Sequence, residues 1–212
     1  MYVLHYSPDS ASLIVRLVLE ELGVAHEARK IDRAAGELDS PAYRAMHPLG
    51  KIPALQTPDG PMFETAAMLL YLSETHGRLA PQPGSPQRAA FLKWLFFTST
   101  NLHTALLQFY YPDRTAGPAC ADAVKAAALA ALKSQLSMLD AMVAREAPDW
   151  LSTAPSVLGY YIAVLMRWLA GPIDARDYPA LLPVLAALET RPAARACAKA
   201  EGLGDTIFTN PA

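Results

Sequence analysis

The first eighty residues alternate short apolar stretches with amphipathic ones, which predicts a small sheet covered by helices. The apolar positions repeat with a period of two in the expected strands and of three to four in the expected helices. In order, the expected elements are a strand at 2–6, a helix at 12–22 stopped by Gly23, a strand at 25–31, a loop with a short helix at 33–47, a strand at 51–56, a return strand at 61–63 after the turn signal Asp59-Gly60, and a helix from 64.

A segment rich in proline and glycine, residues 80–86, separates this part from a helical remainder. Alanine occurs 10 times in residues 1–79 and 29 times in residues 80–212, so the two parts differ in composition. We therefore expect an α/β domain over residues 1–79, a linker, and an all-helical domain over residues 87–212. The expected helices of the second domain cover 87–109, 121–144, 156–169, 178–188 and 193–200.

Composition narrows the class of protein. Hydrophobic residues make up 52% and charged residues 18% of the 212 positions, which is too apolar for a disordered chain. A net charge of −2 gives no basic surplus, so we expect neither a nucleic acid nor an anionic membrane as partner. Cys120 and Cys197 are far apart, which excludes a disulfide framework and predicts no metal site. The first residues lack the pattern of a signal peptide and no apolar run reaches about 20 residues, so a cytoplasmic location is expected.

Ile52-Pro53 opens the third expected strand, where proline has no N–H to donate to a neighbouring strand. If the bond is cis, the preceding backbone turns out of the sheet, and its N–H and carbonyl can pair with an extended ligand. Taken alone, the pair also fits an ordinary trans proline at a sheet edge.

Glu64 and Thr65 begin the helix after the hairpin, and helix N-termini favour anions. The threonine hydroxyl and the backbone N–H groups suit a carboxylate, while Glu64 suits an ammonium. Together they fit the end group of an α-amino acid, although simple capping of the helix fits them too.

A hydroxyl at the first junction between strand and helix is a candidate for activating a thiol. Tyr6 ends the strand, and Ser10 and Ser12 lie at the start of the helix. A free thiol has a pKa of about 8.5. One hydrogen bond to its thiolate, worth about 1.5–3 kcal/mol, lowers that value by roughly one to two units. Capping by the serines and packing of Tyr6 are the simpler roles.

Taken in order, these segments resemble the glutathione S-transferase family over the whole chain. The motifs are Tyr-Ser-Pro-x-Ser at 6–10, His-Pro-Leu-Gly-Lys-Ile-Pro-Ala-Leu at 47–55 and Phe-Glu-Thr-Ala-Ala-Met-Leu-Leu-Tyr-Leu at 63–72. The resemblance is closest to the bacterial beta-like and delta/theta-like branches. It implies a thioredoxin-like N-terminal βαβαββα domain, a C-terminal all-helical bundle, and a homodimer in which one N-terminal domain meets the helices of the partner.

The resemblance also implies roles in binding glutathione as co-substrate. Ile52, before a presumed cis Pro53, matches the backbone contact to the cysteinyl group. Glu64 and Thr65 match the pair that holds the γ-glutamyl end. Lys51 lies where its side chain would meet the glycyl carboxylate.

For catalysis, Ser10 falls on the serine of delta/theta-like enzymes, Tyr6 on the tyrosine of the tyrosine-type classes, and His103 on a beta-class active-site histidine. A pocket for a second, small hydrophobic electrophile is expected between the domains. Plain packing between the domains fits the candidate wall residues equally well. They are Leu106, Leu107, Phe109, Tyr110, Tyr111 and Trp168.

The chain also departs from the family pattern, and these departures weaken the case for ordinary activity. They are Ala11 for the beta-class cysteine, Phe96 for an asparagine, Ala35 and Gly36 where a lysine is expected, and Gly159 for the aspartate of a capping box that begins at Ser156.

Three functions remain open on the sequence alone. The first is a transferase that adds the glutathione thiolate to a small apolar electrophile. The second is a non-catalytic binding or regulatory protein of the same fold. The third is another glutathione-dependent reaction, such as isomerisation, dehalogenation or disulfide reduction, and Ala11 argues against the last of these.

Overall fold

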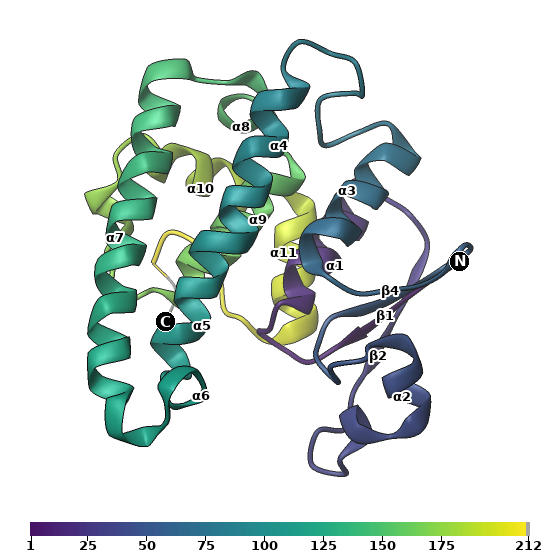
Figure 1. Cartoon of the computed structure of the whole chain (residues 1–212). Helices are drawn as coiled ribbons and strands as arrows, with labels where there is room; N and C mark the ends of the chain where they lie inside the picture. The colour runs from purple at the N-terminus through teal and green to yellow at the C-terminus, as the bar shows by residue number, and fades with distance from the viewer. Residues whose placement is uncertain (211–212) are drawn as a thin grey trace.

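Strand β1 (Tyr2–Tyr6) is an inner strand of a four-stranded sheet with the order β2-β1-β3-β4 (Figure 1). The other strands are β2 (His26–Lys30), β3 (Ala54–Thr57) and β4 (Gly60–Met62). It pairs in parallel with β2 and antiparallel with β3, which in turn pairs antiparallel with β4. The parallel pair requires a crossover, and α1 supplies it. The structure is a computed structural model that describes residues 1–210. The order of elements confirms the predicted βαβαββα arrangement and its thioredoxin-like fold.

The bounds of the elements in this part agree closely with the sequence pattern. The strand expected from residue 51 starts later, because the Ile52-Pro53 segment stays outside the ladder. The remaining elements are α1 (Ser12–Leu22), β2 (His26–Lys30), the short helices η1 (Glu37–Asp39) and α2 (Pro41–Met46), β3 (Ala54–Thr57), β4 (Gly60–Met62) and α3 (Thr65–His76).

Both faces of the sheet are covered. Leu4 lies on the face that packs against α1 and α3, and it is fully buried. His5, the next residue, points to the opposite face, where its ring and that of Tyr43 from α2 pack in a T-shaped arrangement with 5.8 Å between the ring centres. This alternation follows from the period of two in a strand. Helix α1 ends where expected, since Gly23 adopts a left-handed φ of 68° and its N–H closes the helix.

The remainder of the chain is helical, as predicted. Short helical turns that the periodicity does not show fill the connections between the long helices. The elements are α4 (Arg88–Phe97), η2 (Thr98–Leu102), α5 (His103–Tyr110), α6 (Asp113–Ala116), η3 (Pro118–Cys120), α7 (Ala121–Glu146), α8 (Asp149–Ser152), α9 (Val157–Trp168), η4 (Ala175–Asp177), α10 (Leu182–Glu189) and α11 (Pro192–Glu201).

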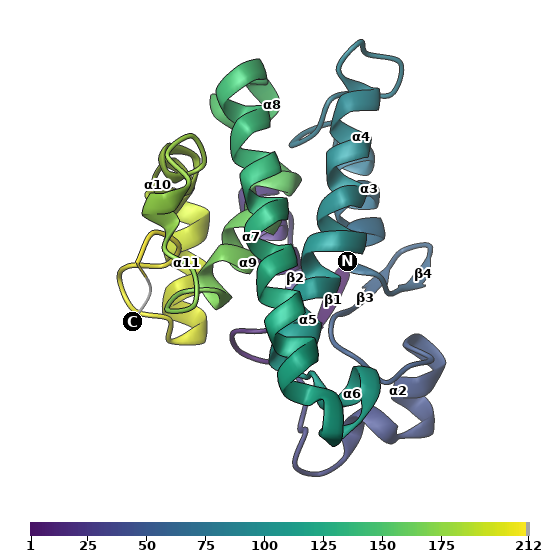
Figure 2. The same cartoon turned by 60° about the vertical axis from the view of Figure 1, so that its left-hand side comes forward.

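The long helix expected over 87–109 is present as a continuous helical stretch, but it is not a regular α-helix at its middle. A π-helical turn, η2, separates α4 from α5, which continue along the same direction (Figure 2). Within this turn the Thr100 hydroxyl donates to the carbonyl of Phe96 at 2.7 Å, which gives that carbonyl a partner outside the regular ladder. The helix expected at 178–188 also starts later, at Leu182, because the η4 turn precedes it.

Helix α9 is the centre of the helical part, as its apolar sequence predicts, and nearly all of its residues are buried. It packs on α1, and α11 lies beside α1 as well (Figure 1). One hydrophobic core therefore runs from the sheet through α1 into the helical bundle. Within residues 1–210, no helix is both long and apolar enough to cross a membrane.

Candidate functional site

The loop before β3 presents an unpaired stretch of backbone. The Ile52–Pro53 bond is cis, as the family resemblance implies. Within residues 1–210, neither the N–H nor the carbonyl of Ile52 has a hydrogen-bond partner. The hydroxyl of Tyr43, on α2, donates a hydrogen bond to the carbonyl of Lys51 at 2.8 Å and holds the loop in place. An extended peptide that pairs with Ile52 would therefore meet a backbone already held in place.

Glu64 holds an unusual backbone conformation at the start of α3. Its φ is +70°, a region that residues other than glycine enter rarely and at a cost of about 1–3 kcal/mol. The first bond of α3 runs from the N–H of Met68 to the carbonyl of Glu64, so the N–H groups of the first turn have no partner within the helix. The Glu64 side chain is exposed, whereas Thr65 is buried. This geometry suits a ligand that carries both an anionic and a cationic group.

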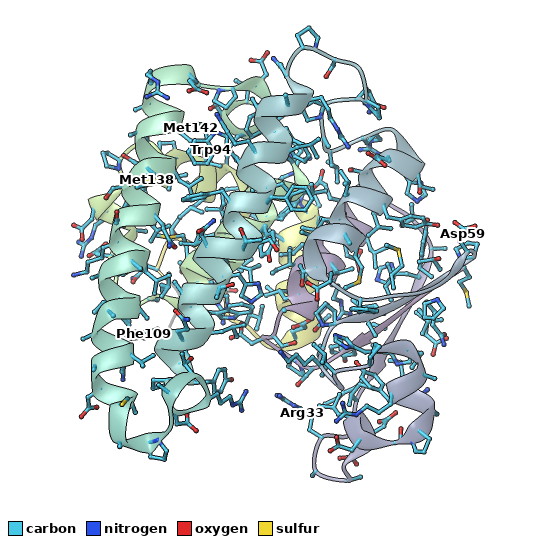
Figure 3. The ribbon with its side chains drawn as sticks, viewed as in Figure 1. Arg33, Asp59, Trp94, Phe109, Met138 and Met142 are labelled. Carbon is cyan, nitrogen blue, oxygen red and sulfur yellow. The ribbon has the colours of Figure 1, made fainter. Side chains whose placement is uncertain are left out.

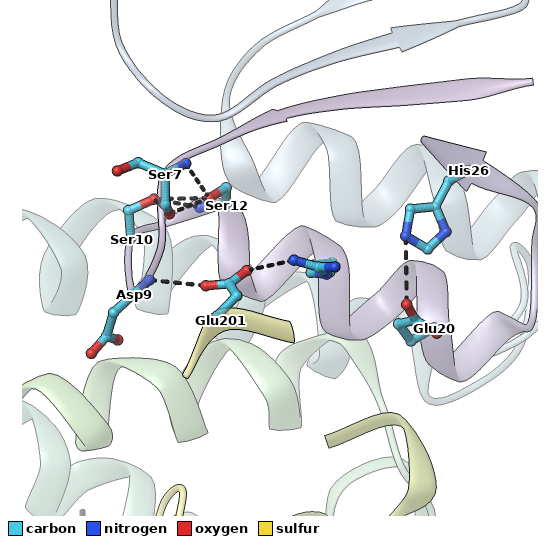
Figure 4. Close-up of polar contacts among 8 residues, drawn as sticks. Ser7, Asp9, Ser10, Ser12, Glu20, His26 and Glu201 are labelled. Carbon is cyan, nitrogen blue, oxygen red and sulfur yellow. Dashed lines mark hydrogen bonds and ion pairs between the residues drawn. The ribbon is translucent and has the colours of Figure 1, made fainter. Parts of the chain in front are cut away.

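Three serines at the junction of β1 and α1 are joined by hydrogen bonds. The Ser10 hydroxyl donates to the carbonyl of Ser7 at 2.7 Å, and its oxygen lies 2.8 Å from the Ser12 oxygen (Figure 4). The Ser12 hydroxyl, fully buried, also bonds to Ser7. The Ser10 proton is thus engaged within the turn, and a bound thiolate receives it only if the hydroxyl rotates away from Ser7.

Tyr6, the rival for activating the thiol, lies at the end of β1 with its ring half-buried. The Arg16 guanidinium stands 5.2 Å from the centre of the ring. The ring also packs against the main hydrophobic core. The structure thus gives Tyr6 a packing role and places Ser10 in the adjacent turn.

An open pocket of about 420 Å³ lies at the carboxyl ends of the parallel strands β1 and β2. Arg33 projects from the loop after β2 toward the end of the helical part that carries α5 and α6 (Figure 3). The family resemblance predicts a lysine where Ala35 and Gly36 stand, and it does not point to Arg33. The general rule that ligands bind at the carboxyl ends of parallel strands does point to Arg33. The pocket is lined by Ser7, Lys30, Ile31, Asp32 and Arg33.

His103 lies on the helical side of the interface, bonded to a residue that the sequence did not single out. Its Nδ1 lies 2.8 Å from the hydroxyl of Tyr161, on the buried helix α9. Burial lowers the pKa of His103 to about 4, so the ring is neutral at neutral pH. Burial raises the pKa of Tyr161, and the negative charge of Glu64 adds to that rise. Both partners of this hydrogen bond are therefore uncharged at neutral pH.

The structure brings some of the expected wall residues together. The Trp168 ring lies 6.1 Å from that of His103, and the Tyr110 hydroxyl donates to the carbonyl of Trp168. Leu106 and Phe109 belong to the hydrophobic core instead, with 3% and 7% of their surface exposed. The accessible part of the wall thus comprises the rings of His103, Trp168, Tyr110 and Tyr111 together with the side chain of Leu107.

Neither cysteine lies among these groups. Cys120 is exposed on the turn before α7. Cys197 is buried in α11, and burial raises the pKa of its thiol, which disfavours a thiolate nucleophile. Among residues 1–210, His, Cys, Asp and Glu side chains form no group of three or more that is placed to hold a metal ion.

Comparison with known proteins agrees with this geometry. Residues 10–75 match the family model described as glutathione S-transferase, N-terminal domain. The solved structure of a sphingomonad glutathione S-transferase complexed with glutathione is similar, with a TM-score of 0.79 and 34% identity over 95% of this chain and 100% of that one. A glutathione transferase from Methylococcus capsulatus has a TM-score of 0.80 and 30% identity over 95% of this chain and 99% of that one.

A different kind of relative matches over part of the chain. A probable elongation factor 1-gamma 2 of Arabidopsis thaliana is 34% identical over 106 residues, which cover 50% of this chain and 25% of that protein. The chain thus spans about a quarter of the length of this relative. Since the solved transferase structures at 30% and 34% identity match along almost their full length, the chain belongs to the glutathione S-transferase family.

Proposed function

We propose that the protein binds glutathione and adds its thiolate to a small hydrophobic electrophile. The observation that carries the proposal is the presence of two backbone features in the same domain. Glu64 has a left-handed backbone at the start of α3, and the backbone of Ile52, beside the cis bond, has no hydrogen-bond partner among residues 1–210. In this arrangement the γ-glutamyl end of glutathione meets Glu64 and Thr65, and its cysteinyl backbone pairs with Ile52. Lys51 and the cations of the open pocket, Lys30 and Arg33, are candidates for the glycyl carboxylate.

The reaction needs an ionised thiol next to an apolar wall. Ser10, with Tyr6 as the rival, stabilises the thiolate by donating a hydrogen bond, which lowers the pKa of the thiol by roughly one to two units. The thiolate sulfur then forms a bond to the electrophilic carbon while a leaving group, such as halide, departs with its electron pair. The neutral ring of His103 and the side chains of Trp168 and Tyr110 face the electrophile. Proximity supplies the remaining acceleration.

One observation favours a second candidate, a non-catalytic binding or regulatory protein. Several of the matched relatives are named elongation factor 1-gamma, and they match over 106 to 145 residues. The engagement of the Ser10 proton within its own turn fits this candidate as well. In that case glutathione binds without turnover, or does not bind.

Retention on immobilised glutathione, followed by conjugation of glutathione to 1-chloro-2,4-dinitrobenzene, separates the candidates. We expect retention and turnover by the wild-type chain. Glu64→Gln and Thr65→Val should each weaken retention on the order of tenfold, because a hydrogen bond to a charged group is worth about 1.5–3 kcal/mol. Glu74→Gln is the matched control, since Glu74 lies on the same helix but bonds to Arg88.

Retention of the wild-type chain on immobilised glutathione without turnover supports the second candidate. Absence of both retention and turnover refutes the transferase. Ser10→Ala and Tyr6→Phe then identify the activating hydroxyl. The variant that lacks it should raise the apparent pKa of the bound thiol by roughly one to two units. Full activity in both variants would show that neither hydroxyl activates the thiol.

The proposed enzyme is a homodimer of two-domain chains. We assign residues 1–79 to the glutathione-binding domain, residues 80–86 to the linker and residues 87–212 to the helical domain. Residues 80–86 lie outside the helices and strands. The division matches the change in alanine content along the sequence.

A further inference from the structure

Asp9 stands directly before Ser10 in the turn between β1 and α1, and its backbone is left-handed, with a φ of 49°. Its carboxylate accepts from Arg167 twice, from Nε at 3.0 Å and from Nη2 at 2.9 Å. It accepts a third hydrogen bond from Nε1 of Trp168 at 2.9 Å. Both donors lie at the end of α9, almost 160 residues away in the sequence, so the contact joins the serine turn to the helical part.

A second carboxylate holds the backbone of the same residue. The N–H of Asp9 donates to Oε2 of Glu201 at 2.9 Å, while Oε1 of Glu201 accepts from Arg16 at 3.3 Å (Figure 4). The Glu201 side chain has no exposed surface. Figure 4 shows the Asp9 carboxylate pointing away from the serines, so the backbone and the side chain are held from two sides. Together these contacts fix a conformation that non-glycine residues adopt infrequently.

Charge strengthens this arrangement. Burial alone would raise the pKa of Asp9, but the hydrogen bonds from Arg167 and Trp168 outweigh it and keep that pKa below its ordinary value. Arg167 is itself 7% exposed in its side chain and also donates to the carbonyl of Ile207. A fork of N–H groups on a carboxylate fixes orientation as well as distance.

The same carboxylate reaches both halves of the proposed site. On one side it is joined through the backbone to Ser10, whose hydroxyl is a candidate for activating the thiol. On the other side it holds the Trp168 indole, whose ring stands 6.1 Å from that of His103. Asp9 is therefore a direct polar link between the turn that carries Ser10 and the aromatic wall.

We propose that Asp9 is a positioning residue for both substrates: its bonds to Arg167 and Trp168 set the place of the Ser10 turn relative to the aromatic wall. The inference rests on the proposed transferase function. It concerns a residue that touches neither substrate in the proposed arrangement and acts through Ser10 and Trp168.

A plain clamp between the two parts of the chain is the alternative, and the protein contains a matched example. At the other end of α1, Glu21 accepts from Arg191 at 2.7 and 2.5 Å and from the Tyr160 hydroxyl at 2.6 Å. This pair has the same chemistry and joins α1 itself to the helical part, but it does not touch the serine turn that contains Asp9. It is therefore the control for loss of stability alone.

The test compares Asp9→Asn with Glu21→Gln. Asparagine tolerates the left-handed backbone, so this substitution removes the charge and not the turn conformation. The measurements are retention on immobilised glutathione, the apparent pKa of the bound thiol from the ultraviolet absorbance of the thiolate, and kcat and KM with 1-chloro-2,4-dinitrobenzene. For Asp9→Asn we expect retained binding of glutathione, a thiol pKa raised by about one unit, and kcat/KM lowered about tenfold. Glu21→Gln should lower the urea midpoint and leave the thiol pKa and kcat unchanged.

Trp168→Phe keeps an aromatic ring and removes only the N–H donor. It should raise the KM for the aryl halide, whereas the pKa of the bound thiol should change little. If Asp9→Asn fails to fold because Arg167 is left unpaired, Asp9→Asn combined with Arg167→Gln removes both charges together. A thiol pKa and kcat equal to those of the wild type in the folded variant would overturn the positioning role and leave the transferase intact. Absence of glutathione binding by the wild-type chain would instead refute the proposed function, and the inference with it.

Discussion

At the scale of single residues, burial decides the chemistry of His103. The ring is bonded to the Tyr161 hydroxyl through Nδ1, and burial lowers its pKa to about 4. At neutral pH the ring is therefore uncharged, and it presents a polar but neutral group to the proposed electrophile. A charged imidazolium at this position would have to lose most of its hydration.

The same shift predicts how stability depends on pH. An unfolded histidine takes up a proton near pH 6.5, whereas folded His103 does so only near pH 4, so stability is complete above pH 6.5 and falls as the pH drops through this window. His103→Gln retains a hydrogen-bonding group without the titration. From pH 7 to pH 5, the free energy of unfolding measured with urea should therefore fall by about 2 kcal/mol more in the wild type than in the variant. Parallel loss of stability in the two proteins would contradict the buried, neutral histidine.

The sequence predicts residues that act through local conformation better than residues that act through contacts. The local setting of Ile52, before a cis proline, and of Thr65, at a helix start, follows from a few neighbouring positions, while their roles in binding stay predictions. The bonds from Arg167 and Trp168 to Asp9 depend on how α9 packs against a turn almost 160 residues earlier. No local pattern carries that information.

At the scale of elements, helix termini are predicted more reliably than helix interiors. Gly23 closes α1 with a left-handed backbone, and Ser156 caps α9. The π-helical turn η2 has the sequence Thr-Ser-Thr-Asn-Leu, and it contains no glycine or proline that would mark a break within the expected helix. It immediately precedes His103, so it determines which face of α5 the imidazole occupies.

The start of α9 is the clearest test of an element. The Ser156 hydroxyl accepts from the N–H of Gly159 at 3.0 Å, and the serine is almost fully buried. The other half of the expected capping box is absent, since glycine stands in place of the aspartate. Ser156→Ala should therefore lower the free energy of unfolding by about 1 kcal/mol, measured by urea titration.

Ser137 offers the matched control for this substitution. It lies exposed on α7, and its hydroxyl donates only to the carbonyl of Lys133. Ser137→Ala should change the free energy of unfolding by less than about 0.5 kcal/mol. Equal effects of the two substitutions would mean that the cap does not stabilise α9.

At the scale of the whole molecule, the division into a sheet part and a helical part follows from periodicity and alanine content, and the structure confirms both classes of element. The sequence does not show that one hydrophobic core passes between them through α1. It also does not show the polar contacts that flank this core, Asp9 with Arg167 at one end of α1 and Glu21 with Arg191 at the other. Both depend on long-range packing.

Large apolar side chains at the surface give the last prediction, which concerns the proposed homodimer. On the sheet part, Leu49 and Phe63 are 59% and 38% exposed, and on α4 Phe96 is 51% exposed. In a two-fold dimer each contact occurs twice, so the N-terminal patch of each chain can cover α4 of the other.

Light scattering should give twice the chain mass of 22.9 kDa for the wild type and for Phe96→Leu, which keeps an apolar side chain. Phe96→Glu should give a single chain, because burial of an unpaired carboxylate opposes association. A wild-type monomer at micromolar concentration, or a stable Phe96→Glu dimer, would exclude this interface.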